Sequence, residues 1–258
     1  MKGLEGKTAI VTGATGHIGG AIAARLLREG ATVYAHGRSP EGARQAADRL
    51  QTDTGGICRP LWADLSDTQQ ISAMFDAFGT QEKRLDILVN NAAALGLDGP
   101  FLQTKVEDWE AVFRVNVTAA LLCTQLAARL MIPNQDGVII NISSNGARRG
   151  HRGRVAYDAS KGALEAAGRS LALELAPYGI RVNNVVPGAI RTSRWDSLPT
   201  ETVARRRAAI PLGREGLPDD VAGVVAFLCS VDAAYITGDT ITVDGGMMAQ
   251  LRPTRDDG

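Results

Sequence analysis

The chain has 258 residues, of which 45% are hydrophobic and 22% charged, so it can bury one large core and we expect a single domain over residues 1–258. Its 28 basic residues balance 28 acidic ones, which excludes an overall field that would attract nucleic acid or an anionic membrane. The first residues lack a signal-peptide pattern and no apolar run approaches about 18 residues, so we expect a cytoplasmic location.

The three cysteines, Cys58, Cys123 and Cys229, lie far apart and form no C-x-x-C pair. Scattered cysteines of odd number are typical of buried free thiols, because a disulfide framework or a zinc site needs them grouped. We therefore expect no disulfide and no metal site.

Short β-branched runs alternate with longer segments of helical period along the whole chain. Seven runs are expected to be strands, at 8–13, 32–37, 57–64, 86–92, 137–144, 180–188 and 240–246. This alternation predicts an α/β chain with a doubly wound Rossmann fold, a seven-stranded and mostly parallel sheet with helices on both faces. Ligands of such sheets bind outside the carboxyl ends of the strands. Polar residues and glycines follow the predicted strands at Gly13, Arg38, Asp64, Asn90, Asn91, Ser144, Pro187 and Gly188.

The segment TGATGHIG, residues 12–19, joins the first predicted strand to the first predicted helix. Glycines let the backbone turn tightly and let its N–H groups approach an anion, while the helix directs its positive dipole end at the same place. A plain turn uses glycine as well, but this position in an alternating α/β chain favours dinucleotide binding.

The end of the second predicted strand bears on the choice of dinucleotide. An acidic residue there would hold the ribose hydroxyl of NAD, whereas an arginine accepts the 2′-phosphate of NADP. The chain has Arg38 and no acid until Glu41, which favours NADP(H), with an arginine solvated at a helix start as the alternative. Asp64 is a candidate acceptor for the adenine amino group, and Asp67 or Ser66 is better placed to cap the following helix.

Tyr157 and Lys161 lie four residues apart in a segment, 155–178, that is predicted to be helical, so both side chains share one face. An ammonium group beside a phenol favours the phenolate, which lowers the pKa of the phenol toward the pH at which enzymes work. Ser144 ends a predicted buried strand and can donate to a carbonyl oxygen, while Ser143 should face the other way. Asn116 lies within an apolar helix, where its amide needs partners.

These residues in this order resemble the short-chain dehydrogenase/reductase family over nearly the whole chain. The matching segments are the glycine loop, NNAA at 90–93, Asn116, Ser144, Tyr157, Lys161, PGAIRT at 187–192, IPLGREGLPDDVA at 210–222 and ITGDTITVDGG at 236–246. The resemblance implies an oxidoreductase of the common single-domain subgroup that acts on carbonyls and alcohols with NADP(H) or NAD(H), most often as a homotetramer, with a homodimer as the alternative.

The resemblance also implies a role for each matching residue. Tyr157 would be the general acid of reduction, Lys161 would assist it and bind the nicotinamide ribose, Ser144 would polarise the carbonyl, and Asn116 would hold a water linked to Lys161. Asn90 would lie near the adenine ribose and Thr192 near the nicotinamide carboxamide. Tyr157 is itself an expected cofactor contact. The remaining ones are Gly13, Thr15, Gly16, His17, Ile18, Gly19, Arg38, Asp64, Leu65, Ala92, Pro187, Gly188 and Ile190.

His17 departs from the pattern of this subgroup, which usually has TGxxxGxG and so a glycine at that position. Here Gly13, Gly16 and Gly19 give TGxxGxxG, a spacing typical of longer family members. We expect Gly16 to take over the tight turn, and His17 to face either a phosphate of the cofactor or solvent.

The substrate pocket is expected between residues 93–104, 145–155 and 191–207, with residues 191–216 acting as a lid and residues 250–258 as a polar tail. The loop at 145–155, here called the basic loop, carries Arg148, Arg149, His151, Arg152 and Arg154. It either attracts an anionic substrate or pairs with acids and solvent. Trp195 is a candidate to cover the pocket.

Two other functions remain open at this point. A noncatalytic NADP-binding sensor or scaffold could share the fold, because fold does not settle function. A sugar epimerase or dehydratase of the longer members would need a further substrate domain, for which the residues after Gly246 leave no room.

Overall fold

The computed structural model describes residues 1–96 and 98–251. Its seven strands are β1 (Thr8–Val11), β2 (Thr32–Gly37), β3 (Cys58–Trp62), β4 (Ile87–Asn90), β5 (Gly137–Ile142), β6 (Ile180–Pro187) and β7 (Thr240–Val243). They form one sheet in the order β3-β2-β1-β4-β5-β6-β7, and the neighbouring pairs between the described strands are parallel. The predicted doubly wound sheet is therefore confirmed.

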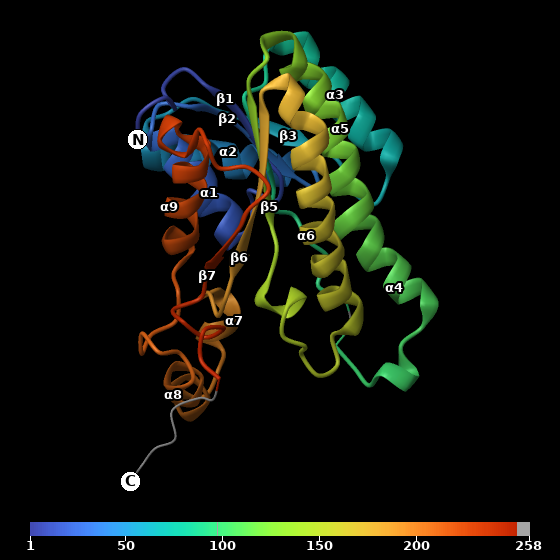
Figure 1. The fold of residues 1–258 in the computed structure, drawn as a ribbon, viewed down its shortest axis with the longest axis vertical. Helices are drawn as coiled ribbons and strands as arrows, with labels where there is room; N and C mark the ends of the chain where they lie inside the picture. Colours follow the sequence, from blue (N-terminus) through green and yellow to red (C-terminus); the bar gives the residue numbers. More distant parts are fainter. Residues whose placement is uncertain (97, 252–258) are drawn as a thin grey trace.

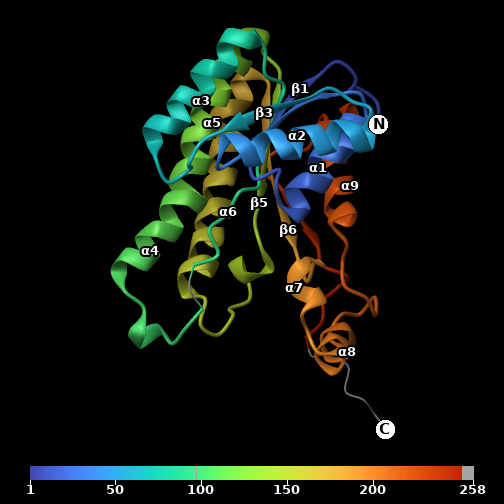
Figure 2. The same cartoon turned by 180° about the vertical axis from the view of Figure 1, so that it is seen from behind.

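The α-helices cover both faces of this sheet (Figure 1). They are α1 (His17–Arg28), α2 (Pro40–Thr54), α3 (Thr68–Gln81), α4 (Val106–Phe113), α5 (Ala119–Met131), α6 (Val155–Leu175), α7 (Ser193–Asp196), α8 (Thr200–Ala208) and α9 (Pro218–Cys229). Figure 2 shows the same layers from behind, with α1, α2 and α9 on one side of the sheet and α3, α5 and α6 on the other. Helices α7 and α8 lie beyond the carboxyl ends of the strands.

Alternating strand residues enter two separate cores. In β1, Val11 packs in a core with Ile22 of α1 and Val225 of α9, whereas Ile10 packs in a second core with Phe78 of α3 and Met131 of α5. A strand that is buried on both faces needs apolar residues at every position, which explains the near-continuous apolar runs.

Several elements end earlier than the sequence predicts. The fourth strand stops at Asn90 rather than at residue 92, and the fifth at Ile142 rather than at residue 144. The helix that begins at Val155 ends at Leu175, and a 3-10 turn with a proline in its first turn continues to Tyr178. Proline cannot donate the next helical hydrogen bond, so the helix tightens there.

The predicted lid, residues 191–216, contains the helices α7 and α8, and its two ends lie side by side. Ile190 forms a parallel bridge with Gly216, and the N–H of Arg191 donates to the Gly216 carbonyl at 2.7 Å. Most of the predicted tail, residues 252–258, lies outside the described residues.

The cysteines are free and buried, as expected, and burial raises the pKa of each thiol to about 12. Within residues 1–96 and 98–251, no group of three or more His, Cys, Asp or Glu side chains could hold a metal ion. One helical stretch there, Val106–Asn134, is long and apolar enough to cross a membrane by length and composition alone. Core helices of globular proteins meet the same criterion, and this stretch packs on α3 and α6.

Candidate functional site

A large cleft opens at the carboxyl ends of the strands, with a volume of about 1540 Å³. This exceeds the roughly 300–1,000 Å³ of a site for one small ligand, so a dinucleotide and a second molecule fit together. The cleft lies at the switch point between β1 and β4, where doubly wound sheets bind ligands. The predicted residues that line it are Gly13, Thr15, Gly16, His17, Ile18, Gly19, Arg38, Asp64, Leu65, Ala92, Ser144, Tyr157, Lys161, Pro187, Gly188, Ile190 and Thr192.

Two of the three glycines in the loop are required by its geometry. Gly13 has a φ of +66°, in the left-handed region, and a Cβ there would lie 3.0 Å from the Cα of Ala92. A Cβ on Gly19 would overlap the carbonyl oxygen of Gly13. Gly16 has a φ of −91° and room for a Cβ, so the expectation that it takes over the tight turn is corrected. Gly13 makes that turn.

The glycine loop leads into the N-terminus of α1, which faces the cleft. Gly16 is the N-cap and offers no side chain to the first backbone N–H groups, and the first turn contains no acidic residue. Helix N-termini in this state suit an anion, because the N–H groups and the dipole both favour negative charge. The residues present therefore fit the pyrophosphate of a dinucleotide.

His17, the first residue of α1, contacts the predicted lid. Its Nε2 accepts a hydrogen bond of 3.1 Å from the backbone N–H of Ser193, the first residue of α7. The imidazole is exposed and lines the cleft beside the glycine loop, so it does not simply face solvent. A contact of His17 with a phosphate stays a prediction.

His36, at the end of β2, fixes the glycine loop, a role that the sequence did not indicate. Its Nδ1 accepts from the N–H of Gly13 at 3.1 Å and its Nε2 lies 3.1 Å from the carbonyl oxygen of Ala63, so the ring is neutral with its proton on Nε2. Burial lowers its pKa from 6.5 to about 4. A histidine in an apolar strand gives no sequence signal for such a role.

His36 is expected to make the fold sensitive to acid. The unfolded chain binds its proton near pH 6.5 and the folded chain only near pH 4, so stability falls as the pH drops through this window, by up to about 3 kcal/mol. His36→Asn keeps an acceptor for Gly13 and does not titrate. Urea unfolding at several pH values should show that the free energy of unfolding falls more steeply with decreasing pH for wild type than for His36→Asn. The same pH dependence for both proteins would refute this role.

The end of β2 and the loop after β3 shape the other end of the cleft. Arg38 is exposed and lines it, near enough to Asp64 to favour that carboxylate electrostatically. Hydrogen bonds from the backbone N–H and then the hydroxyl of Ser66 lower the pKa of Asp64. Asp67 caps α3 by accepting from the N–H groups of Gln69 and Gln70, as expected.

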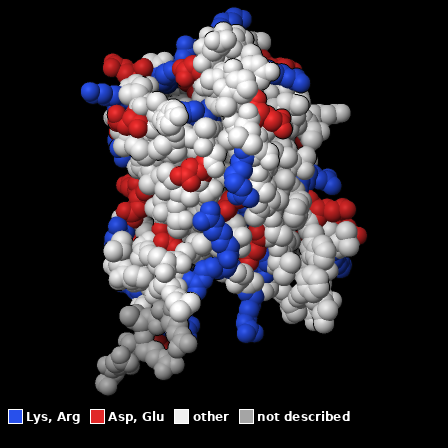
Figure 3. All heavy atoms as spheres, viewed as in Figure 1, with Lys and Arg blue, Asp and Glu red and all other residues white. Residues whose placement is uncertain are grey.

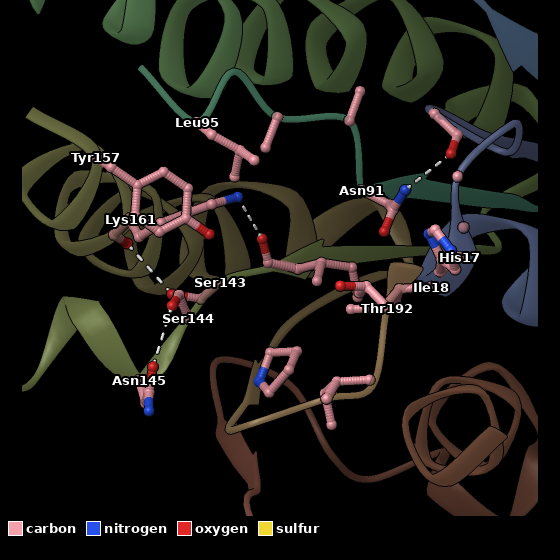
Figure 4. A pocket seen from close by; sticks show the side chains of 18 of the residues that line it. His17, Ile18, Asn91, Leu95, Ser143, Ser144, Asn145, Tyr157, Lys161 and Thr192 are labelled. Atoms are coloured by element: carbon pink, nitrogen blue, oxygen red, sulfur yellow. Dashed lines mark hydrogen bonds between the residues drawn. The ribbon is translucent and has the colours of Figure 1, made fainter. Parts of the chain in front are cut away.

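Asn90 does not reach the cleft, which corrects its predicted place near the adenine ribose. Its side chain is buried and donates to Thr124 at 3.0 Å and to Asn141 at 3.0 Å. Asn141 donates in turn to Asn184, so a ladder of amides crosses β4, β5 and β6. Asn91, one residue later, lines the cleft instead (Figure 4). Its side chain donates to the Thr12 carbonyl at 2.8 Å.

Tyr157 and Lys161 project from the first turns of α6 into the cleft (Figure 4). The Nζ of Lys161 lies 5.8 Å from the centroid of the Tyr157 ring and donates to the Ile142 carbonyl at 2.8 Å. Lys161 is buried, and desolvation lowers the pKa of its ammonium from 10.5 to about 8. An ammonium held this close stabilises negative charge on the phenol oxygen.

Ser144 lies just after β5 on the same wall of the cleft. Its Oγ accepts from the N–H of Gly146 at 3.2 Å, which orients the hydroxyl group at the start of the basic loop. Ser143 faces the other way, as expected, and donates to the buried carboxylate of Glu165 at 2.7 Å. Figure 4 shows Ser144 and Tyr157 on one side of the cleft, and His17, Ile18 and Thr192 on the other.

Asn116 lies behind the cleft wall, in a π-helical turn, Arg114–Thr118, between α4 and α5. Its amide accepts from the N–H of Ala94 at 2.7 Å and donates to the Ala94 carbonyl and to Ser160, whose hydroxyl donates to the Tyr157 carbonyl. The side chain therefore joins the 92–96 loop to α6 and does not itself line the cleft. Such π turns are frequent at functional sites.

The predicted lid is held together internally by a buried acid that the sequence did not single out. Glu215 accepts from Arg207 at 2.5 and 2.8 Å and lies 3.7 Å from Arg191, so it holds both ends of the segment. The hydrogen bond from Arg207 lowers the pKa of Glu215 to about 2. Trp195 of α7 is buried against the cleft, with the Arg206 guanidinium 5.5 Å from its ring centroid.

Part of the basic loop has polar partners within the chain. Arg148 pairs with Glu165 at 3.0 Å, Arg149 donates to the Met247 carbonyl, and His151 pairs with Asp158 at 3.0 Å. His151, Arg152 and Arg154 line the cleft. The loop as a whole is therefore not one anion site.

Comparison with known proteins gives matches over nearly the whole chain. A family model described as enoyl-(acyl carrier protein) reductase matches residues 13–248. The chain is 41% identical to 3-oxoacyl-(acyl-carrier-protein) reductase FabG of Aquifex aeolicus, over 95% of this chain and 98% of the relative. It is 37% identical to a 3alpha-hydroxysteroid dehydrogenase of Mediterraneibacter gnavus, over 94% and 97%.

The fold is shared with solved structures of the same size. One is a Beutenbergia cavernae protein with bound NADP, provisionally assigned as an NAD(P)-dependent gluconate 5-dehydrogenase. The TM-score is 0.89 at 36% identity, covering 96% of this chain and 98% of that chain.

Proposed function

The chain belongs to the short-chain dehydrogenase/reductase family and is an oxidoreductase acting on CH–OH and C=O groups, and we propose that Tyr157 is the proton donor and acceptor of this reaction. The observation that carries the proposal is the convergence of Tyr157, Lys161 and Ser144 on one wall of the cleft, opposite the glycine loop. The relatives act on unlike substrates, so they define the reaction and leave the substrate open.

NADP(H) is the cofactor that the residues at the cleft fit, with NAD(H) possible in the family. The uncapped N-terminus of α1 suits the pyrophosphate, and Arg38 at the end of β2 suits a 2′-phosphate. The solved relative from Beutenbergia cavernae contains NADP. Contacts of the cofactor with Asp64, Leu65, Ala92, Pro187, Gly188, Ile190 and Thr192 are proposed from their place in the lining.

The residues of the chain supply orientation and the proton. Bound NADPH supplies the hydride for the carbonyl carbon. Ser144 donates a hydrogen bond to the substrate oxygen, and Tyr157 gives it the proton, helped by the adjacent Lys161 ammonium. Asn116 acts at a distance, because its amide fixes the 92–96 loop and α6; the water that the family resemblance assigns to it stays a proposal.

Arg38 is expected to set the preference for NADPH over NADH. Arg38→Ala should raise KM for NADPH about 10- to 100-fold and leave KM for NADH nearly unchanged, because a charge-assisted contact with the 2′-phosphate is lost. Arg44→Ala, an exposed arginine of α2, serves as the matched control. Equal effects on the two cofactors would contradict this assignment.

A substrate screen tests the proposed function as a whole. The purified protein is mixed with NADPH or NADH and a panel of ketones, quinones and oxo esters, and loss of the reduced nicotinamide absorbance is recorded. Turnover of any member, in wild type and not in Tyr157→Phe, supports the proposal. Tight NADPH binding without turnover of any compound would favour the noncatalytic sensor.

We further propose that the chain forms a homotetramer or a homodimer in the cytoplasm. In the most apolar window of the helical stretch Val106–Asn134, 39% is buried within the chain. On the same face of the sheet, Leu173 of α6 is 79% exposed. Apolar side chains on this face are therefore available to a partner. The free buried cysteines suit a reducing compartment. Light scattering after size exclusion measures the assembly, and a monomer would refute it.

A further inference from the structure

The substrate end of the cleft carries an excess of positive side chains. Arg152, Arg154 and Arg206 line it, and among the described lining residues at this end the one carboxylate is that of Asp98. Figure 3 shows Lys and Arg side chains gathered in the lower middle of the face, between the lower end of α6 and the region of α7 and α8. An excess of one sign in a cleft concentrates ligands of the other sign.

Arg154 is the member of this group that lies against the reacting residues. It precedes α6 directly, and its guanidinium carbon is 4.6 Å from the centroid of the Tyr157 ring, nearer than the Lys161 Nζ. The side chain is 20% exposed, so the ring and the cleft wall hold it in place. A group bound to this guanidinium lies within a few bonds of a carbonyl at Tyr157.

One edge of the Arg154 guanidinium lacks hydrogen-bond partners. Nε and Nη2 are buried and make no hydrogen bond with the described residues. Asp98, whose side chain is 68% exposed, forms an ion pair with this edge: its Oδ1 lies 3.0 Å from Nε but outside hydrogen-bond geometry. Buried donors without partners are unfavourable, and the parallel N–H groups of Nε and Nη2 match the two oxygens of one carboxylate.

We propose that the substrate carries a carboxylate that displaces Asp98 and binds this edge of Arg154. The inference rests on the proposed oxidoreductase function and adds the substrate class, a short oxo acid and its hydroxy acid. Arg152 and Arg206 contribute charge at the rim of the cleft. Arg148 and Arg149 of the basic loop have partners within the chain and take no part.

Matched pairs of substrates test the proposal. Short 2-oxo, 3-oxo and 4-oxo acids are compared with their methyl esters, which keep the carbonyl and lose the charge. We expect wild type to prefer at least one acid, and Arg154→Gln to lower kcat/KM for that acid about 10- to 100-fold more than for its methyl ester. Arg154→Lys should recover part of the loss, and Arg149→Gln, in the same loop, should have no effect.

Binding measured without turnover separates this proposal from the proposed function. Calorimetry on the Tyr157→Phe variant with NADPH should show that the preferred acid binds more tightly than its ester, and that Arg154→Gln in this background removes the difference. Esters reduced as well as acids, or an equal loss for both on Arg154→Gln, would overturn the carboxylate site and leave the oxidoreductase intact. Acid binding without turnover in wild type would overturn the proposed function alone.

Discussion

Tyr157→Phe is expected to lower kcat for NADPH-dependent reduction by about 10²- to 10⁴-fold. A general acid or base contributes a factor of this size, and phenylalanine keeps the ring while removing the transferable proton. The ring contacts with Arg154 and Lys161, at 4.6 and 5.8 Å from its centroid, do not need the hydroxyl group, so the fold of the cleft should persist. Steady-state rates with a substrate found in the screen measure the loss.

The matched control is Tyr178→Phe, which removes a hydroxyl group from an exposed tyrosine at the far end of the same helical segment. It should retain wild-type kcat. NADPH binding, followed by fluorescence titration, should change little in Tyr157→Phe, because the expected phosphate contacts come from the glycine loop and Arg38. A Tyr157→Phe enzyme that keeps most of its kcat would remove this residue from the chemistry.

The sequence predicted the sheet and most of the cleft because both depend on short-range patterns. Alternation of apolar runs with helical stripes fixes a parallel sheet, and chain order then brings the strand ends together at one edge. Gly13, Ser144, Tyr157 and Lys161 are separated by many residues, yet each follows a strand or opens a helix, so one topology places all four in the cleft.

The errors come from side-chain direction and from partners distant in sequence. Asn90 and Asn91 are adjacent in the sequence, but β4 ends at Asn90, and only Asn91, in the loop that follows, lines the cleft. His36 binds a loop 23 residues earlier, and Arg148 pairs with a carboxylate 17 residues later. Such pairings depend on three-dimensional packing, which residue types and spacing alone do not encode.

At Lys161 the requirements of stability and of function are opposed. Its ammonium group must lie next to Tyr157 to assist proton transfer, and that place is buried beneath the cleft wall. Burial of a charge without a carboxylate partner is unfavourable, and the hydrogen bond to the Ile142 carbonyl offsets only part of it. Natural sites accept such an unfavourable placement where chemistry requires it.

Lys161→Met is expected to abolish most activity, by at least about 10²-fold, because the phenol loses its stabilising cation and the nicotinamide ribose its proposed contact. Methionine has a similar length and no charge, so it fits the buried position. Exposed Lys83→Met is the matched control and should leave kcat unchanged. Activity within a few fold of wild type would show that the ammonium is dispensable.

The same variant should be more stable than wild type at neutral pH. The pKa of Lys161 is about 8 in the folded chain against an ordinary lysine value of 10.5, so at pH 7 the folded state bears a charging penalty of about 3 kcal/mol. Loss of the hydrogen bond to the Ile142 carbonyl lowers the stability of the variant by about 1 kcal/mol. The net gain in its free energy of unfolding is therefore about 2 kcal/mol. Between about pH 8 and 10.5 Lys161 is protonated in the unfolded chain and neutral in the folded chain. The stability of wild type should therefore rise as the pH rises through this range, and the stability advantage of Lys161→Met should shrink. Urea unfolding at neutral and alkaline pH measures both effects, and a destabilised, inactive Lys161→Met would mean that the ammonium supports the fold rather than strains it.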